Sequence, residues 1–377
     1  MPMPGGRHPS ACGISPTYEI PTLDYEDAPF LVIWEVTQAC DLACVHCRAS
    51  ARPMRDVREL SREEARRVFG EIRGMGTRLL VLTGGDPLKR ADIFDLIRDA
   101  RAVGLKPALS PSATPLLTAE GLEKGREAGL SAVSLSLDGA TAETHDRFRG
   151  IPGAYARTME AAAQIRAAKL ELRLNTTVTS INVGELESIA REAGRMDAKV
   201  WSVFFLVPTG RASESMQISP TQCEEVLSWL YRLSATAPFR IKTTEAPHYR
   251  RVVLETMAQE AGVDMNELLE RTRSGGGRFM PGMNDARGFA FISHVGDLFP
   301  SGFFPLSAGN VRNTSMAELY RNSALFRALR DPDKLTGRCG ACEYRSVCGG
   351  SRARAWAATG DPFGEDPLCA YPGASAR

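Results

Sequence analysis

Three cysteines near the start of the chain have the spacing of iron–sulfur ligands. Cys40, Cys44 and Cys47 form the pattern CxxxCxxC and follow the apolar run Leu31-Val32-Ile33-Trp34. Thiolates at this spacing can bind three irons of one [4Fe–4S] cluster and leave the fourth iron without a protein ligand. Because an iron left open in this way can bind another molecule, the loop indicates catalysis.

A zinc site is the alternative that the cysteine spacing leaves open. Structural zinc sites close with four ligands, usually arranged in CxxC-type pairs. Near this loop a fourth ligand exists only if His46 turns inward. The pattern therefore favours an iron–sulfur cluster over zinc.

A second group of cysteines lies near the C-terminus. Cys339 and Cys342 form a CxxC pair, Cys348 follows after five intervening residues, and Cys369 stands further along the chain. Four thiolates can complete either a [4Fe–4S] cluster or a zinc site, and their spacing does not choose between the two.

The composition predicts a cytoplasmic globular protein. The 377 residues carry a net charge of +1 without a sizeable basic cluster, so we expect no nucleic-acid partner. No apolar run reaches the ~18 residues that a membrane span needs, and the start of the chain lacks a signal-peptide core. In a reducing compartment most of the nine cysteines should be metal ligands. We expect Cys223 to be a packed core thiol and Cys12 not to be a ligand.

The first half of the chain alternates short aliphatic runs with amphipathic helical segments. This alternation predicts an α/β fold, a partial (β/α)6 TIM-like barrel followed by a small cysteine-rich C-terminal α+β domain. We divide the chain into a tail (1–29), a barrel (30–215), a helical bridging segment (216–280) and a C-terminal domain (281–377). The expected strands are 31–36, 79–83, 106–110, 132–137, 171–179 and 200–207.

Local signals refine this division. Ser61 and Glu64 form an expected capping box, and Asn182 is expected to cap the helix after the fifth strand. Residues 288–300 suggest a β-hairpin, and the glycine-rich stretch 274–278 suggests a hinge, a lid or a plain linker.

Polar residues stand where the predicted strands end. In a parallel barrel functional groups gather at the C-terminal ends of the strands, and the first cysteine loop follows the first strand. The second strand ends in Gly84-Gly85-Asp86-Pro87, and Ser110 and Ser112 follow the third. Ser136 ends the fourth strand and Asn175 lies on the fifth. We therefore expect the first cluster and these residues at one end of the barrel.

The CxxxCxxC loop and the Gly-Gly-Asp-Pro turn one strand later together resemble the radical S-adenosylmethionine (SAM) superfamily. The turn is similar to the GGE-P turn of that family, with Asp86 in place of glutamate. The resemblance implies that SAM chelates the open iron and that one electron from the cluster cleaves it to a 5′-deoxyadenosyl radical. It also implies an electron donor such as flavodoxin or ferredoxin.

The resemblance implies further contacts to SAM. The turn formed by Gly84, Gly85, Asp86 and Pro87 is expected at the SAM amino group. Ser110, Ser136 and Asn175 are candidates for the carboxylate and ribose, with core packing as the alternative. Arg149 is a candidate for the carboxylate, which a guanidinium can bind through two parallel hydrogen bonds. A solvated loop charge is the alternative for Arg149.

The second cysteine group resembles SPASM/twitch-type extensions of the same superfamily. That resemblance implies one auxiliary [4Fe–4S] cluster held by Cys339, Cys342, Cys348 and Cys369. Full SPASM domains hold a second auxiliary cluster, but Arg352 and Ser301 stand here where such domains carry cysteines. We therefore expect two clusters in the whole chain.

Three further segments look similar to the haem-biosynthesis branch, which includes the haem d1 enzyme and the decarboxylase of iron-coproporphyrin. They are residues 44–48, 242–251 and 307–312. The resemblance implies a tetrapyrrole substrate, with His248, Tyr249, Arg250 and Arg251 either binding its propionates or forming a domain-interface salt bridge.

Three other functions remain open. The first is maturation of a ribosomal peptide, although many such maturases carry an extra N-terminal recognition domain and only residues 1–29 precede the first strand here. The second is formation of a glycyl radical or formylglycine on a partner enzyme. The third is a non-catalytic iron–sulfur protein, which would not need an open iron.

Overall fold

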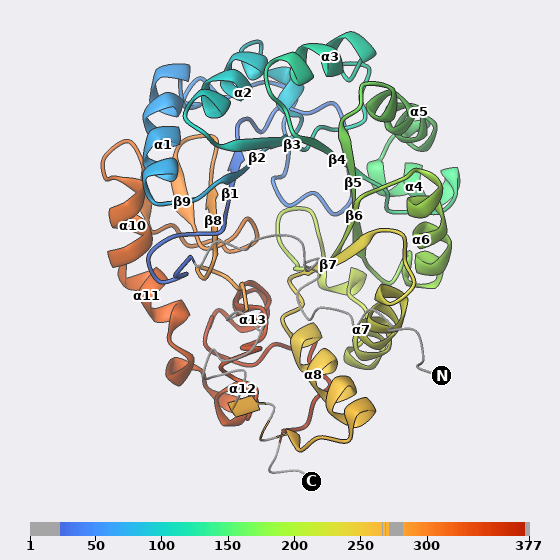
Figure 1. The fold of residues 1–377 in the computed structure, drawn as a ribbon, viewed down its shortest axis with the longest axis vertical. Helices are drawn as coiled ribbons and strands as arrows, with labels where there is room; N and C mark the ends of the chain where they lie inside the picture. The colour runs from blue at the N-terminus through green and yellow to red at the C-terminus, as the bar shows by residue number, and fades with distance from the viewer. Residues whose placement is uncertain (1–22, 266, 268, 271–281, 374–377) are drawn as a thin grey trace, which may run out of the picture.

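The computed structural model describes residues 23–265, 267, 269–270 and 282–373. Seven parallel strands follow one another in chain order and form a curved sheet (Figure 1). They are β1 (Leu31–Glu35), β2 (Leu79–Thr83), β3 (Lys106–Leu109), β4 (Ala132–Ser136), β5 (Glu171–Val178), β6 (Val200–Phe205) and β7 (Arg240–Thr244). Cys12 and the stretch 274–278 lie outside the described residues.

Helices cover the outer face of this sheet (Figure 1). Their bounds are α1 (Arg62–Gly74), α2 (Ile93–Ala102), α3 (Ala119–Glu127), α4 (Ala142–Arg149), α5 (Ala154–Ala167), α6 (Leu186–Arg195), α7 (Pro220–Ser234) and α8 (His248–Ala261). The six predicted βα units are confirmed, and each predicted strand agrees with the observed one to within two residues. The prediction of a partial barrel is therefore correct.

Strand β7 was not foreseen, because the segment 216–280 was expected to be helical. It pairs in parallel with β6 and adds a seventh strand to the barrel sheet. Its sequence Arg-Ile-Lys-Thr-Thr contains a single apolar side chain, Ile241, and so lacks the apolar pattern by which strands are recognised. Helices α7 and α8 account for most of the rest of the described segment.

The C-terminal part continues the same sheet on the other side of β1. Strand β8 (Phe289–Ile292) pairs in parallel with β1, and β9 (Asp297–Phe299) and β10 (Gly309–Asn310) follow as antiparallel strands. The expected hairpin is thereby confirmed as β8 and β9. In the described part of the chain the other α-helices are α10 (Met316–Asn322), α11 (Ala324–Arg330), α12 (Gly337–Ala341) and α13 (Arg352–Thr359).

The two faces of the sheet differ in burial, as β5 shows. Leu172, Leu174 and Val178 are buried in the main hydrophobic core together with residues of the outer helices. Arg173 and Asn175 alternate with them and are only partly buried, so they lie on the opposite, concave face. We call this concave side of strands β1–β8 the inner face.

The capping signals were correct in one case and wrong in the other. Ser61 and Glu64 form the expected capping box at the start of α1. Asn182 makes no side-chain cap and precedes a 3₁₀ turn before α6. Its amide instead donates to the carbonyls of Asp138 and Thr177, each at 2.9 Å, and so holds together the loops after β4 and β5.

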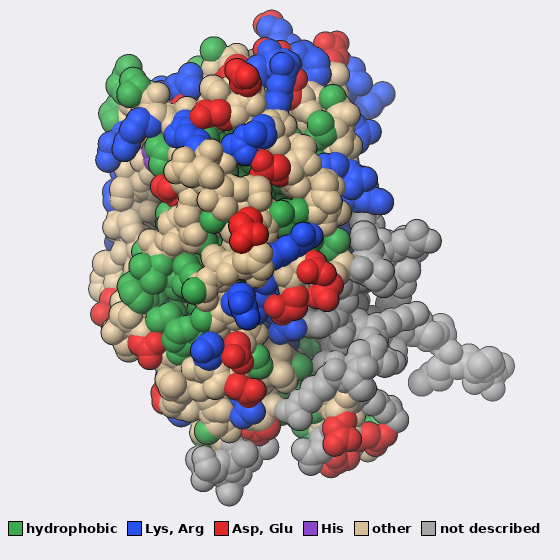
Figure 2. Space-filling model, turned by 90° about the vertical axis from the view of Figure 1, so that its left-hand side faces the viewer, with side chains coloured by type: hydrophobic (Ala, Val, Ile, Leu, Met, Phe, Trp, Pro, Cys, Tyr) green, Lys and Arg blue, Asp and Glu red, His purple; other side chains and the backbone are tan. Residues whose placement is uncertain are grey.

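The surface mixes charges of both signs. Figure 2 shows basic and acidic side chains interspersed over the face that carries α1. Several of them pair, as Arg62 does with Asp99 at 2.6 Å and Arg312 with Glu64 at 2.6 Å. Within the described chain, every helix is too short or too polar to cross a membrane.

Candidate functional site

The first cysteine loop lies between β1 and α1, at the C-terminal end of the strand. Cys40 and Cys44 are each 8% exposed and pack with Leu42, and the partly buried Cys47 lies against them. The Cys40 sulfur receives the Leu42 N–H at 3.4 Å and lies 3.5 Å from the Ser112 hydroxyl. Burial raises the pKa of the Cys40 thiol. Its thiolate therefore needs nearby positive charge, such as that of bound iron.

Arg149 brings positive charge to this loop from the last turn of α4. Its Nη1 donates to the Cys44 sulfur at 3.7 Å, and its Nη2 forms a buried ion pair with Asp138. Burial acts to raise the pKa of Asp138, but Arg149 and then His46 bring it below the ordinary value. The second Asp138 oxygen accepts the Thr177 N–H at 2.7 Å. Arg149 is thus held by a fixed carboxylate beside a cluster thiol.

His46 does not turn toward the cysteine sulfurs. Its ring packs edge-on against Phe148 with centroids 5.1 Å apart, and its Nε2 lies 3.9 Å from Asp138. Burial lowers the pKa of His46 to about 4, so the ring is neutral at neutral pH. Across the described residues no three His, Cys, Asp or Glu side chains converge on a single metal ion. His46 is thus engaged by Phe148 and Asp138.

The Gly84-Gly85 turn packs directly against the cysteine loop. A Cβ atom on Gly84 would lie 2.3 Å from the Thr37 carbonyl oxygen, and one on Gly85 would lie 2.5 Å from that of Ala39. The Gly85 N–H donates to the Thr37 carbonyl at 2.8 Å. Because any side chain would separate the two segments, glycine is required here for the turn to reach the loop.

Asp86 and Pro87 follow in the same turn, but the Asp86 carboxylate points into the protein. It accepts the Leu88 N–H at 3.2 Å and the Thr114 hydroxyl at 2.7 Å. Burial raises the pKa of Asp86 above the ordinary value. The backbone of Asp86, rather than its carboxylate, faces the cysteine loop, with its N–H donating to the Ala39 carbonyl at 2.7 Å.

Ser136 and Asn175 are brought together, and Ser110 directly follows β3. Ser136 is the last residue of β4, and its register partner Asn175 lies within β5, on the inner face. The Ser110 N–H donates to the Leu82 carbonyl at 2.9 Å and so extends the pairing of β3 with β2. Ser112 approaches the loop instead, since its hydroxyl donates to the Gly85 carbonyl at 2.9 Å and lies near Cys40.

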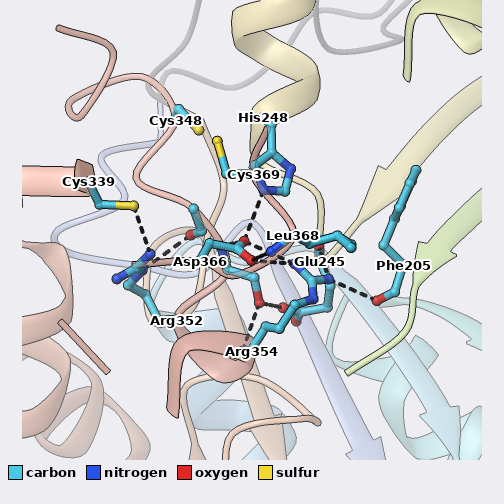
Figure 3. A network of polar contacts seen from close by, with 12 residues as sticks. Phe205, Glu245, His248, Cys339, Cys348, Arg352, Arg354, Asp366, Leu368 and Cys369 are labelled. Atoms are coloured by element: carbon cyan, nitrogen blue, oxygen red, sulfur yellow. Dashed lines mark hydrogen bonds and ion pairs between the residues drawn. The ribbon is translucent and has the colours of Figure 1, made fainter. Parts of the chain in front are cut away.

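The four C-terminal cysteines line one cavity. Cys339 lies on α12, Cys342 directly follows it, and Cys348 and Cys369 come from the loops on either side of α13. Figure 3 shows the thiols of Cys348 and Cys369 close together. Burial raises the pKa of Cys342 and Cys348 to about 11 and that of Cys369 to about 12. These thiols remain protonated at neutral pH unless a metal replaces the proton.

Arg352 occupies the space beside this cavity and is fully engaged (Figure 3). It is 1% exposed, and its Nη2 donates to the Cys339 sulfur at 3.7 Å. Its Nη1 donates to the carbonyls of Pro362 and Gly364 at 2.9 and 2.8 Å. A guanidinium therefore lies where a full SPASM domain would place a further thiolate.

Arg354 connects the second cysteine site to the barrel (Figure 3). Its Nη1 lies 2.9 Å from Asp366, and its Nη2 donates to the carbonyls of Phe205 and Glu245 at 3.1 and 2.6 Å. Phe205 ends β6, and Glu245 directly follows β7. The end of the barrel and the cysteine-rich loops are thus held by one buried side chain.

The basic segment after β7 supports the same interface. His248 Nε2 lies 3.0 Å from Asp366, and Arg250 donates to the Cys348 carbonyl at 3.1 Å. Arg251 pairs with Glu224 at 2.5 Å and with Glu255 at 2.6 Å. His248 and Arg250 are thus engaged at the interface with the cysteine-rich loops, and Arg251 is paired with carboxylates of α7 and α8.

Ser112 and Asp138 were expected among the polar residues at the strand ends, but no role was predicted for either. Asp138 orients Arg149, and Ser112 approaches Cys40. Both follow the end of a predicted strand, which is the one signal that pointed to them. Cys223 is confirmed as a core thiol, since it is 1% exposed within α7.

Comparison with known proteins gives the same picture. A model of the radical SAM superfamily matches residues 34–193. The chain is 42% identical over 345 residues to the AdoMet-dependent heme synthase of Methanosarcina barkeri, covering 92% of this chain and 97% of that protein. It is 31% identical over 357 residues to the mycofactocin maturase of Mycobacterium ulcerans, covering 91% of this chain and 88% of that protein.

Among solved structures, SuiB of Streptococcus suis bound to S-adenosylmethionine shares the fold, with a TM-score of 0.69 at 15% identity. The match covers 92% of this chain and 78% of SuiB. The chain therefore belongs to the radical SAM superfamily and is an enzyme that uses S-adenosylmethionine and a [4Fe–4S] cluster.

Proposed function

We propose that this enzyme oxidatively decarboxylates propionate side chains of an iron tetrapyrrole in haem biosynthesis. The observation that carries the proposal is the 42% identity to a heme synthase over nearly the whole of both chains. In this reaction a propionate loses a hydrogen atom from its β-carbon, then carbon dioxide and one electron, and becomes a vinyl group. The hydrogen atom goes to the 5′-deoxyadenosyl radical that SAM supplies when bound.

The first site has residues for each part of SAM activation. Cys40, Cys44 and Cys47 would ligate the cluster and leave one iron open. The backbone of the Gly84-Gly85 turn would meet the SAM amino group, because only glycine allows it to lie this close to the loop. Ser110, Ser136, Asn175 and Arg149 remain candidates for the other polar groups of SAM, with Arg149 already bound to Asp138.

The second site would hold the auxiliary cluster. Four partly buried thiols around one cavity have the donor chemistry of a closed [4Fe–4S] site. The position of Arg352 against Cys339 supports one auxiliary cluster rather than two. An auxiliary cluster here could accept the electron that each decarboxylation releases.

The cellular setting belongs to the same proposal. We place the enzyme in the cytoplasm with a flavodoxin or ferredoxin as electron donor, and we retain the division into tail, barrel, bridging segment and C-terminal domain. The buried Arg354 contacts support a C-terminal domain that is docked firmly on the barrel.

The first test is anaerobic reconstitution with iron and sulfide, followed by counting iron and assaying dithionite-driven formation of 5′-deoxyadenosine. We expect about eight irons in wild type and about four in a Cys40/Cys44/Cys47 triple alanine variant. Only wild type should cleave SAM, and with iron coproporphyrin III it should release carbon dioxide. Zinc in place of iron, or no SAM cleavage by wild type, would contradict the proposal.

Peptide maturation is the second candidate function. It is favoured by the 31% identity to mycofactocin maturase, which is lower than the identity to the heme synthase. Wild-type enzyme that cleaves SAM but leaves iron coproporphyrin III unchanged would direct the search to peptides.

A further inference from the structure

One row of residues crosses the inner face from β4 to β7. Ser136 pairs with Asn175, Asn175 with Ser202, and Ser202 with Lys242. Register partners in parallel strands point to the same face, so Lys242 lies on the inner face with Asn175. Two strand spacings separate Asn175 from Lys242, which places their Cα atoms about 10 Å apart.

Lys242 is the cation in this row of residues. Within the described part of the chain its ammonium forms no hydrogen bond or ion pair, and its Nζ lies 5.7 Å from the centroid of the Phe289 ring. The side chain is partly buried between β7 and β8, which lie on opposite sides of the opening in the barrel sheet. Every other lysine or arginine discussed above pairs with a carboxylate or donates to backbone carbonyls.

The side chains near Lys242 on the inner face include a second cation and its carboxylate partner. Arg173 lies on the inner face of β5 and pairs with Glu171 at 2.7 Å. From β6 the neighbour is Ser202, and from β8 it is Phe289. Burial first, and Arg173 second, lower the pKa of Lys242 to about 8. The protein therefore holds an ammonium where its charge is disfavoured, and a bound anion would remove that penalty.

Aromatic side chains border the same part of the inner face. Phe204 follows Ser202 by two residues on β6, and its ring lies 6.3 Å from that of Phe303. Both rings are partly buried, as is that of Phe289, which lies nearest to Lys242 among the three. Flat apolar surface next to one cation suits a large aromatic ligand that carries carboxylates.

We infer that Lys242 binds a carboxylate of the substrate on the inner face, about two strands from the candidate SAM residue Asn175. The inference rests on the proposed function and adds the residue that fixes the orientation of the tetrapyrrole. An ion pair stabilises a carboxylate relative to neutral carbon dioxide. Lys242 therefore holds a propionate that is retained and leaves the reacting propionate free beside SAM.

The test compares Lys242→Met and Lys242→Arg with wild type and with the control Lys199→Met. Lys199 is an exposed lysine that pairs with Asp197 at 2.7 Å, away from the inner face. The probes are iron coproporphyrin III and its methyl ester, titrated anaerobically by absorbance. We expect Lys242→Met to weaken binding of the free acid by about tenfold or more, equivalent to ~1.4 kcal/mol. Binding of the ester should be unchanged, and Lys199→Met should bind both probes like wild type.

The pH profile separates a charge contact from a structural effect. In wild type the affinity for the free acid should fall as pH rises through about 8, because the ammonium loses its proton there. Lys242→Arg should keep its affinity through this range because a guanidinium stays charged. If Lys242→Met fails to fold, the pH profiles of wild type and Lys242→Arg provide the test. A Lys242→Arg affinity that still falls above pH 8 would overturn the inference.

Two failures can be told apart. Free-acid binding by Lys242→Met that equals wild type overturns the role of Lys242 and leaves the proposed function intact. Wild-type enzyme that cleaves SAM but neither binds nor decarboxylates the porphyrin overturns the proposed function, and the inference with it.

Discussion

The cysteine loop depends on a buried ion pair that lies directly behind it. Asp138 is 1% exposed and Arg149 12% exposed, and the pair lies beside the Cys44 sulfur. In such a site the attraction between partners offsets a large desolvation cost, so loss of one partner leaves an uncompensated charge. The pair therefore fixes a positive group at the cluster thiols.

Replacing Arg149 with methionine should lower the free energy of unfolding by about 3–5 kcal/mol, because the Asp138 carboxylate would be left buried and unpaired. The double variant with Asp138→Asn should recover part of this loss. Denaturant titration of the reconstituted proteins measures both. A double variant that is less stable than Arg149→Met alone would contradict this account.

A single added methyl group should disrupt the first site. Gly85→Ala would place its Cβ 2.5 Å from the Ala39 carbonyl oxygen, and backbone cannot yield as a flexible side chain can. We expect loss of the first cluster and of SAM cleavage, measured by iron content and nucleoside formation. The matched control is Gly70→Ala in α1, where nothing lies within 4 Å of the new Cβ. That change should keep activity and stabilise the protein by about 0.8–1 kcal/mol.

At the level of elements, the sequence predicted the parts that repeat a strong pattern. Strands β1 to β6 each carry an apolar run, and the cysteine spacings identify both sites. Strand β7 was not predicted, because it lacks an apolar pattern. Its pairing with β6 makes it a strand. The contacts of Asp138 and Lys242 join strands distant in sequence, so only the folded chain reveals them.

The second cysteine site is assembled from α12 and the loops before and after α13, and this leads to a prediction about Cys369. Cys369→Ala should lose the auxiliary cluster and reduce the iron content by about half, because a closed cluster needs its fourth thiolate. The control is Cys223→Ala, whose thiol is buried in α7 and outside both groups. Its iron content should equal that of wild type. Unchanged iron and spectra in Cys369→Ala would remove Cys369 from the ligands.

For the whole molecule, the buried polar network in Figure 3 holds the barrel against the cysteine-rich loops. Arg354 reaches the ends of β6 and β7, and Glu245 accepts the Ser351 hydroxyl from the start of α13. Burial, and then the Asp285 carboxylate, raise the pKa of Glu245. Glu245 is therefore protonated in the folded enzyme under conditions in which the unfolded chain would ionise it.

This proton makes stability depend on pH. In the unfolded chain the Glu245 carboxyl releases its proton above its ordinary pKa of 4.5. In the folded enzyme the raised pKa keeps that proton bound. The free energy of unfolding should therefore fall as pH rises from that value toward the raised pKa. Glu245→Gln cannot ionise and should show a flatter profile in denaturant titrations across this range. An identical slope in both proteins would show that Glu245 does not retain its proton.

The pairing of β1 with β8 has a consequence for synthesis of the protein. Leu31 is the first residue of β1, the strand that precedes the first cysteine loop. In the β1–β8 pair it lies opposite Phe289. While the ribosome is still making the intervening residues, β1 can pair only with β2 and leaves one edge of backbone groups exposed. Exposed edges of this kind recruit other chains. We therefore expect the nascent chain to be prone to aggregation until β8 has emerged.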